Sequence, residues 1–188
     1  MVKINKKYKI IYADPPWSYN DKASAGNRGA SCKYPVMSTY QISRLAVEEI
    51  ADDDCVLFLW STWPMIQDAL GVIKSWGFIY KTAAFVWIKK NGNGTWCRKM
   101  GHWTRSNSEF CLLATKGKPK AISHDIYQVI ESTPKEHSKK PDVVRDRITQ
   151  LCGDLPRVEL FARAKAHGWD VFGNDERLKH QTLEIFYS

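Results

Sequence analysis

The sequence has little of what a secreted or membrane protein needs. Its five cysteines are odd in number and scattered, with no Cys-x-x-Cys pair, so neither a disulfide framework nor a clustered metal site is expected. No apolar run approaches the roughly 18 residues that cross a membrane, and the basic start lacks the apolar stretch of a secretory signal. We therefore predict a cytoplasmic protein with reduced thiols, without a bound metal and without a membrane partner.

Acidic residues are also scarce relative to basic ones. The 188 residues include 28 Lys and Arg against 20 Asp and Glu, which gives a net charge of +8 and a pI near 9.2. An excess of this size favours a polyanionic partner but says nothing about the fold. The length fits a single domain over residues 1–188 with a substantial core.

The most informative stretch is residues 9–17, which read Lys-Ile-Ile-Tyr-Ala-Asp-Pro-Pro-Trp. It begins as a buried strand and stops at Asp14, which the following proline pushes toward an extended conformation. Pro15 and Pro16 have no N–H group and cannot continue a ladder inside a sheet. In an α/β sheet, the region beyond the carboxyl end of a strand is where ligands bind.

These residues suit a planar amino group on an aromatic ring. The Asp14 carboxylate only accepts hydrogen bonds, the Pro15 carbonyl offers a further acceptor, and Trp17 could cover the ring. An amino nitrogen held through both hydrogens presents its lone pair to an electrophile. A methyl sulfonium leaves as a neutral thioether and needs no general acid, so positioning and electrostatics suffice. The alternative is a strand ending in a proline turn, with Trp17 in the core.

Periodicity and end signals predict an alternating α/β chain. Ser38 and Gln41 form a capping-box pattern before a helix with an apolar face from Ile42 to Ile50. The acidic run 52–54 is expected to be a solvated turn. Further strands are predicted at 55–60, 78–88, 110–115, 157–162 and 169–173. Helices are predicted from Thr62 to Gly77 and over 142–152, with Gly77 and Gly153 as their ends, whereas 121–136 shows weak periodicity.

Residues 89–105 combine five basic side chains with two tryptophans and contain no acid. Basic groups interleaved with aromatic rings fit a nucleic-acid groove, in which phosphates take the charge and bases stack. A solvated hairpin loop is the alternative. Tyr34, near the end of a long loop over 18–37, is expected to reach back over the pocket. The candidate substrate contacts in the basic stretch are Lys90, Trp96, Arg98, Lys99, His102, Trp103 and Arg105.

The order and spacing of these motifs resemble a known family over nearly the whole chain. It is the Asp-Pro-Pro-Trp type of N6-adenine methyltransferases, which includes the catalytic subunit of the messenger-RNA adenosine methyltransferase and bacterial and phage DNA adenine methyltransferases. The resemblance is carried by Asp14–Trp17, Tyr34, Met37-Ser38, Leu57–Trp60, Gly101–Trp103, Glu109, Lys140–Asp142, Val158–Phe161, Arg163 and Gly173-Asn174.

The resemblance implies a Rossmann-like, doubly wound S-adenosylmethionine-dependent methyltransferase sheet in permuted motif order. Asp14, Pro15, Pro16 and Trp17 would be catalytic, and Trp60 and Glu109 would contact the substrate. The usual Gly-x-Gly cofactor fingerprint is absent. S-adenosylmethionine would instead be held by Ile11, Asp14, Lys140, Glu159, Leu160, Phe161, Arg163 and Asn174.

The chain departs from its relatives at three points. Lys139 stands where they have His, with His137 two places earlier, and Asp175 follows Asn174 where Gln is common. The accessory regions of RNA-modifying members are also lacking. The basic loops must therefore unstack the target adenine, or the substrate must already be single-stranded.

We predict methyl transfer to the 6-amino group of adenine in DNA, in the cytoplasm of a bacterium or a phage-infected host cell. Two alternatives stay open: the same reaction on RNA, and a non-catalytic nucleic-acid-binding subunit. The sequence does not fix the oligomeric state, a homodimer included.

Overall fold

The computed structural model describes residues 6–18, 36–101, 103–135 and 139–173, and the statements that follow concern this part of the chain. Three predicted site residues, Tyr34, His102 and Asn174, lie outside the described residues, as does most of the loop over 18–37.

A seven-stranded sheet forms the centre of the molecule, in the order β5-β3-β4-β2-β1-β6-β7. β4 runs antiparallel to both β2 and β3, whereas β1 pairs in parallel with β2 and β6, β6 with β7, and β3 with β5. The strands are β1 Tyr8–Ala13, β2 Ala51–Ser61, β3 Ile79–Lys89, β4 Ser108–Lys116, β5 Val129–Ser132, β6 Arg157–Leu160 and β7 Asp170–Phe172.

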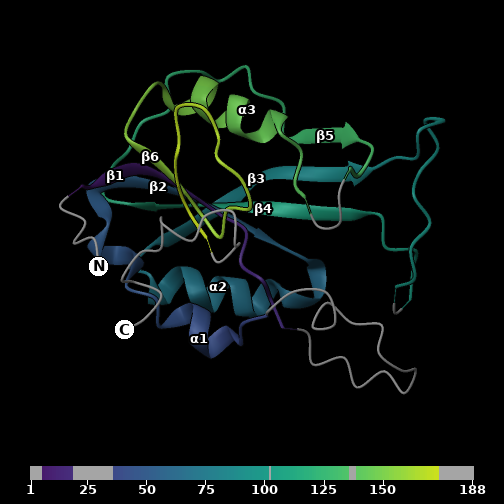
Figure 1. Cartoon of the computed structure of the whole chain (residues 1–188), viewed down its shortest axis with the longest axis horizontal. Coiled ribbons are helices and arrows are strands. Elements are labelled where there is room, and N and C mark those ends of the chain that lie inside the picture. Colours follow the sequence, from purple (N-terminus) through teal and green to yellow (C-terminus); the bar gives the residue numbers. More distant parts are fainter. Residues whose placement is uncertain (1–5, 19–35, 102, 136–138, 174–188) are drawn as a thin grey trace.

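Helices cover both faces of this sheet (Figure 1). α1 (Thr39–Ser43) and α2 (Ile66–Ser75) lie on one face, together with the short 3-10 turns η2 (Val47–Glu49) and η3 (Trp63–Met65), and α3 (Val143–Cys152) lies on the other. β1 is apolar on both sides because it is covered on both. Ile11 and Ala13 pack toward α1 and α2, while Ile10 and Tyr12 belong to the cluster on the α3 side.

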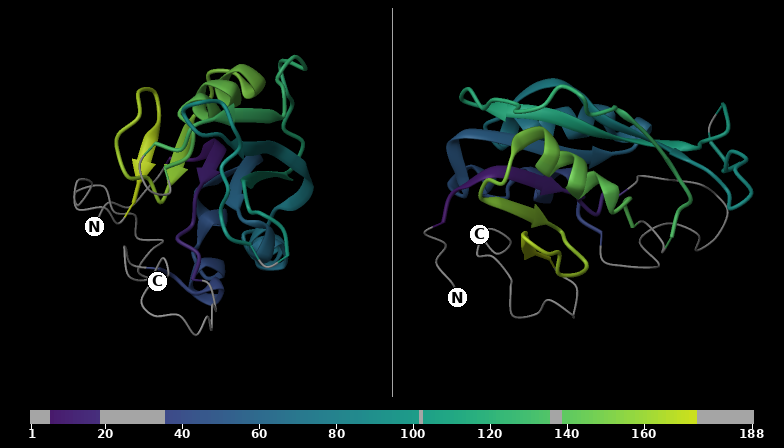
Figure 2. Two further views of the ribbon diagram at one scale, coloured as in Figure 1. Left: turned by 90° about the vertical axis from the view of Figure 1, so that its right-hand side faces the viewer. Right: turned by 90° about the horizontal axis from the view of Figure 1, so that it is seen from above.

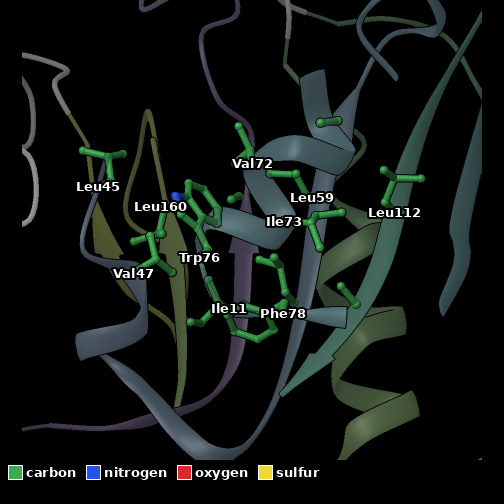
Figure 3. Close-up of a cluster of buried hydrophobic side chains, with 14 of the residues drawn as sticks. Ile11, Leu45, Val47, Leu59, Val72, Ile73, Trp76, Phe78, Leu112 and Leu160 are labelled. Carbon is green, nitrogen blue, oxygen red and sulfur yellow. The ribbon is translucent and has the colours of Figure 1, made fainter. Parts of the chain in front are cut away.

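The larger core joins the first two helices to the sheet (Figure 3). Trp76, which ends α2, is fully buried, and its indole N–H donates to the Ile42 carbonyl at 3.0 Å. Ile11, Phe78 and Leu160 pack in the same cluster. The large apolar side chains of α2 are buried in this cluster or packed against it, so the helix is stabilised mainly by tertiary burial.

Several local signals in the sequence act as predicted. The Ser38 side chain accepts from the Gln41 amide at 3.2 Å, and the Gln41 side chain accepts from the Ser38 amide at 2.9 Å, which completes the capping box. Gly77 and Gly153 adopt φ of +78° and +91° beyond the ends of α2 and α3, a conformation that favours glycine.

Three expectations about elements were wrong. The first helix ends at Ser43 instead of continuing to Ile50, and a separate 3-10 turn follows it. The acidic run 52–54 is not a turn but the start of β2, where Asp54 accepts from the Lys118 amide at 2.7 Å. β5 was not predicted, since four residues at the sheet edge show no periodicity.

The topology gathers one set of strand ends. β1, β2, β3 and β6 all end at the same edge, and β4 begins there because it runs against its neighbours. The chain leaves β1 toward α1 on one face and enters β6 from α3 on the other, so the crevice between β1 and β6 is the expected ligand position. We call the edge at which β1, β2, β3 and β6 end the carboxyl edge. Figure 2 shows how the connection between β3 and β4 extends beyond it.

The described cysteines Cys55, Cys97, Cys111 and Cys152 are free thiols. Among the described residues, no helix is long and apolar enough to span a membrane.

Candidate active site

Asp14 meets its main partner at the carboxyl edge. Lys140, just before α3, places its ammonium 2.8 and 2.9 Å from the two carboxylate oxygens of Asp14. Both side chains are largely buried, with 12% of Lys140 and 23% of Asp14 exposed. The two residues are 126 positions apart in the sequence. The fold brings them together because β1 ends, and α3 begins, at the carboxyl edge of the sheet.

The ion pair continues into a row of alternating charges. Lys140 also lies 3.4 Å from Glu109, the second residue of β4. Glu109 pairs in turn with Lys89, the last residue of β3. The two ammonium groups lie over indole rings, Lys140 5.4 Å from the centre of Trp60 and Lys89 4.7 Å from that of Trp87. We call Asp14, Lys140, Glu109 and Lys89 the charge row.

Burial and neighbouring charge set the pKa values of the charge row. Burial raises the pKa of Asp14; Lys140 and Arg163 oppose this, whereas Glu109 adds to it. For Glu109, burial is outweighed by the two lysines, which lower the pKa of its carboxyl. The pKa of Lys140 is raised, because Asp14 and Glu109 outweigh the burial of its ammonium. Lys140 therefore carries a full charge at neutral pH and holds two carboxylates in place.

Buried hydrogen bonds fix the backbone around Asp14. The Trp17 indole donates to the Trp60 carbonyl at 3.0 Å, and the Trp60 indole donates to the Tyr12 hydroxyl at 2.7 Å. Trp17 is only 5% exposed and belongs to the core, as the alternative interpretation of the motif held. The Trp17 amide donates to the Pro15 carbonyl at 2.9 Å, which leaves that oxygen one further lone pair. Stacking of Trp17 on a substrate ring stays a prediction.

The end of β6 lies next to this centre and carries several predicted cofactor residues. Glu159 is buried and receives a bidentate pair from Arg145 of α3, at 2.6 and 2.9 Å. Leu160 and Ile11 are core side chains, so only their backbone could face a ligand. Phe161 has a φ of +62°, a strained value for a residue with a side chain and one that gathers at functional sites.

Close backbone contact continues where β7 ends. A Cβ atom on Gly173 would lie 2.0 Å from the Ala162 carbonyl oxygen, and the Ala162 amide donates to the Phe172 carbonyl at 3.0 Å. The segment after β6 and the end of β7 are therefore in backbone contact, which requires glycine at 173. Asn174, the next residue, lies outside the described residues.

The basic stretch lies at the same edge but is open to solvent. Trp96 is 62% exposed and Trp103 99% exposed, and Arg98, Lys99 and Arg105 are exposed too. Lys90 forms an ion pair of 2.7 Å with Glu131 on β5. The exposed tryptophans agree with a binding surface more than with a simple solvated hairpin.

Comparison with known proteins decides the family. The sequence matches the MT-A70 family over residues 8–175. The chain belongs to this family. It is 38% identical to the type II methyltransferase M.MunI of Mycoplasma over 187 residues, covering 89% of this chain and 77% of that protein. It is 27% identical to the human N(6)-adenosine-methyltransferase catalytic subunit METTL3 and 30% identical to a putative N(6)-adenosine-methyltransferase MT-A70-like protein of Medicago truncatula, and covers only 29% and 26% of their lengths.

The MT-A70 assignment confirms the resemblance, the predicted α/β fold and the class of enzyme, a methyltransferase. Of the predicted residues, the structure brings Asp14, Lys140, Glu109 and Trp60 into one cluster. Sequence reasoning missed Lys89 and Arg145. Lys89 was detectable from strand alternation, since it shares a sheet face with Trp87, whereas Arg145 has no local signal because its partner lies 14 residues away.

Proposed function

We propose that this MT-A70 chain transfers a methyl group from S-adenosylmethionine to the exocyclic 6-amino group of adenine in DNA, in the cytoplasm of a bacterium or phage-infected cell. The observation that carries the proposal is the placement of the Asp14 carboxylate. It stands beyond β1, beside the crevice with β6, in a buried cluster where the Lys140 ammonium pairs with it.

The substrate amino group would be held by Asp14 and the Pro15 carbonyl. An ionised carboxylate has about four lone-pair positions, and Lys140 takes one on each oxygen. Asp14 therefore retains capacity to accept an N–H of the adenine amine. With both amino hydrogens engaged, the nitrogen lone pair leaves conjugation and becomes nucleophilic. The new N–C bond would form as the S–C bond of the sulfonium breaks, the neutral thioether would leave without a proton donor, and the methylated nitrogen would give up one proton along its hydrogen bond to Asp14.

The residues around the crevice fit S-adenosylmethionine. Lys140 supplies a buried ammonium for the cofactor's carboxylate, and Asp14 an anion for its amino group. Phe161 adopts a strained turn just after β6, and Gly173 lies against the backbone of Ala162 in the same segment. Arg163 follows directly in sequence. Glu159, Leu160, Ile11 and Asn174 complete the proposed set. The cofactor supplies the electrophilic methyl group.

DNA is proposed over RNA because the similarity to the type II methyltransferase M.MunI spans most of this chain and most of M.MunI. The adenosine methyltransferases match over less than a third of their own length. Their names support RNA as the second candidate. The exposed basic surface serves either polymer, because phosphate contacts carry no information on the sugar.

The deciding experiment compares Asp14→Asn with wild type, using labelled cofactor on matched DNA and RNA oligonucleotides. We expect the variant to lose about 100-fold or more in rate, as when a group that stabilises a transition state is removed. Asp53→Asn, at an exposed acid in β2, is the matched control. Circular dichroism verifies folding, and calorimetry measures cofactor affinity. A variant that methylates at the wild-type rate would show that Asp14 does not hold the amine, and RNA-only activity would reassign the substrate.

A further inference from the structure

The connection between β3 and β4 contains a hollow that none of the proposed catalytic steps uses. It has a volume of about 600 Å³ and is lined by Asn91, Thr95, Trp96, Cys97, Arg98, Arg105 and Asn107. Figure 1 shows this connection extending past the ends of β3 and β4. A volume in the range of about 300–1,000 Å³ is typical of small-molecule sites, and we call this hollow the loop pocket.

Hydrogen bonds hold the walls of the loop pocket in place. The Asn91 amide donates to the Thr95 carbonyl at 2.7 Å, and the Asn91 side chain donates to the Thr95 hydroxyl at 2.9 Å. The Cys97 amide donates to the Lys89 carbonyl at 2.9 Å, and the Lys89 amide donates to the Asn107 carbonyl at 2.8 Å. The pocket is therefore fastened at both ends to the last residue of β3, which favours binding with little ordering cost.

The lining has the chemistry of a nucleotide site. Trp96 is 62% exposed and offers a ring on which a base can stack, an interaction that tolerates any base. Arg98 and Arg105 contribute two cations, and none of the lining residues is acidic. Guanidinium groups bind phosphate oxygens in a bidentate manner. Asn107 contributes an amide, a group that can bond to a base edge.

The loop pocket is connected directly to the charge row. Lys89, whose backbone fastens the pocket, pairs through its side chain with Glu109, and Glu109 lies 3.4 Å from Lys140, which binds Asp14. The pocket and the proposed amine site thus lie on the same edge, joined by three successive side-chain contacts. A nucleic-acid strand with one nucleotide at Asp14 could therefore extend along this edge toward the loop.

We propose that the loop pocket binds the unstacked base of a nucleotide flanking the target adenine, with the base against Trp96 and its phosphate at Arg98 and Arg105. This rests on the proposed function and extends it. The flanking nucleotide anchors the strand while the adenine amine is presented to Asp14. A strand already unstacked at two neighbouring positions is the preferred substrate, since the cost of unstacking does not then fall on the enzyme.

The test is a double-mutant cycle on equilibrium binding. Fluorescence anisotropy measures the affinity of wild type and Trp96→Ala for single-stranded DNA oligonucleotides that contain one adenine, with an abasic site scanned through the neighbouring positions. For wild type, we expect one flanking abasic site to weaken binding about tenfold, in keeping with the loss of one stacked base. In Trp96→Ala, the same abasic site should have no further effect, because the ring that it would stack on is gone.

The matched control is Tyr80→Ala, which removes an aromatic ring 44% exposed at the far end of β3. This variant should keep the full sensitivity to the abasic site. Equal sensitivity in wild type and Trp96→Ala at every position would overturn the proposal, as would wild-type insensitivity throughout. Because the readout needs neither cofactor nor methyl transfer, its failure is separable from that of the proposed function. If the protein methylates adenine but abasic-site sensitivity does not depend on Trp96, the loop-pocket proposal is wrong and the proposed function stands.

Discussion

The carboxyl edge presents two groups of charged residues that differ in burial and in ion pairing. In the charge row, Lys140 and Glu109 are 12% and 18% exposed and every charge contacts an opposite one. In the loop between β3 and β4, Arg98, Lys99 and Arg105 are exposed, and the side chain of Trp103 is 99% exposed. The first group is suited to fix the geometry of a reaction, and the second to take hold of a polymer.

Desolvation explains the difference. A buried charge without a partner costs several kcal/mol, so the members of the charge row hold one another at defined distances. An exposed charge gains little from a partner and remains available to phosphates, whose counterions are released on binding. Each region would fail at the task of the other.

The largest expected effect comes from exchanging glycine for alanine at a packed position after β7, at the carboxyl edge, and at an open position in the loop. Gly173→Ala should lower the free energy of unfolding by about 3 kcal/mol, because the new Cβ would meet the Ala162 carbonyl at 2.0 Å. Gly92→Ala, with no atom within 4 Å of its Cβ position, should change it by no more than about 0.5 kcal/mol. Urea denaturation of both variants measures the difference. Similar losses would show that the loop is packed as tightly as the end of β7.

The second test concerns pH. If ionised Asp14 accepts the amine, activity rises as the pH increases through its raised pKa. Lys140 lowers this pKa and Glu109 raises it, so Lys140→Gln should move the acid limb to higher pH and Glu109→Gln should move it to lower pH. The measurement is kcat against pH at saturating cofactor and DNA.

Asp53→Asn, near the start of β2 and so at the opposite end of the strand from the carboxyl edge, serves as the control for the pH profiles and should leave the acid limb unchanged. Shifts in the same direction for Lys140→Gln and Glu109→Gln would mean that a group other than Asp14 sets the limb.

The smallest expected effect is a change in salt dependence. Arg98→Ala should weaken binding to single-stranded DNA and reduce the slope of log K against log salt by about 0.7, the loss of one phosphate contact. Lys74→Ala, at an exposed lysine of α2, provides a matched loss of charge that should leave the slope unchanged. If both variants reduce the slope equally, net charge and not the loop determines affinity.

Local signals in the sequence were sufficient for much of the fold. The proline pair after Asp14, the capping box at Ser38 and Gln41, and the glycines that end α2 and α3 each act through near neighbours, and each was predicted. β5 was missed because it is a four-residue strand at the sheet edge, whose register comes from β3, outside any local window. The acidic start of β2 was missed because the β1–β2 register shifts there, between Tyr8↔Ala51 and Ile10↔Val56, and burial imposes no pattern on exposed Asp53 and Asp54.

The site was predictable in its residue types but not in its partners. The motif pointed to Asp14, and the family resemblance to Lys140, whereas their direct pairing follows from the topology. Lys90 was chosen from the basic stretch, yet Lys89 enters the charge row and Lys90 pairs with Glu131 instead. Neighbouring residues of a strand face opposite sides of the sheet, so a composition-based choice has no means of separating them.

The reversed direction of β4 determines where the chain can change in length without disturbing the sheet. Since β3 leaves and β4 returns at the same edge, the segment joining them is a hairpin rather than a crossover. Residues added to or removed from its tip displace neither strand, and lengthening a surface segment adds little closure entropy. A change in the length of this segment therefore leaves the charge row, and the strands that carry it, in place.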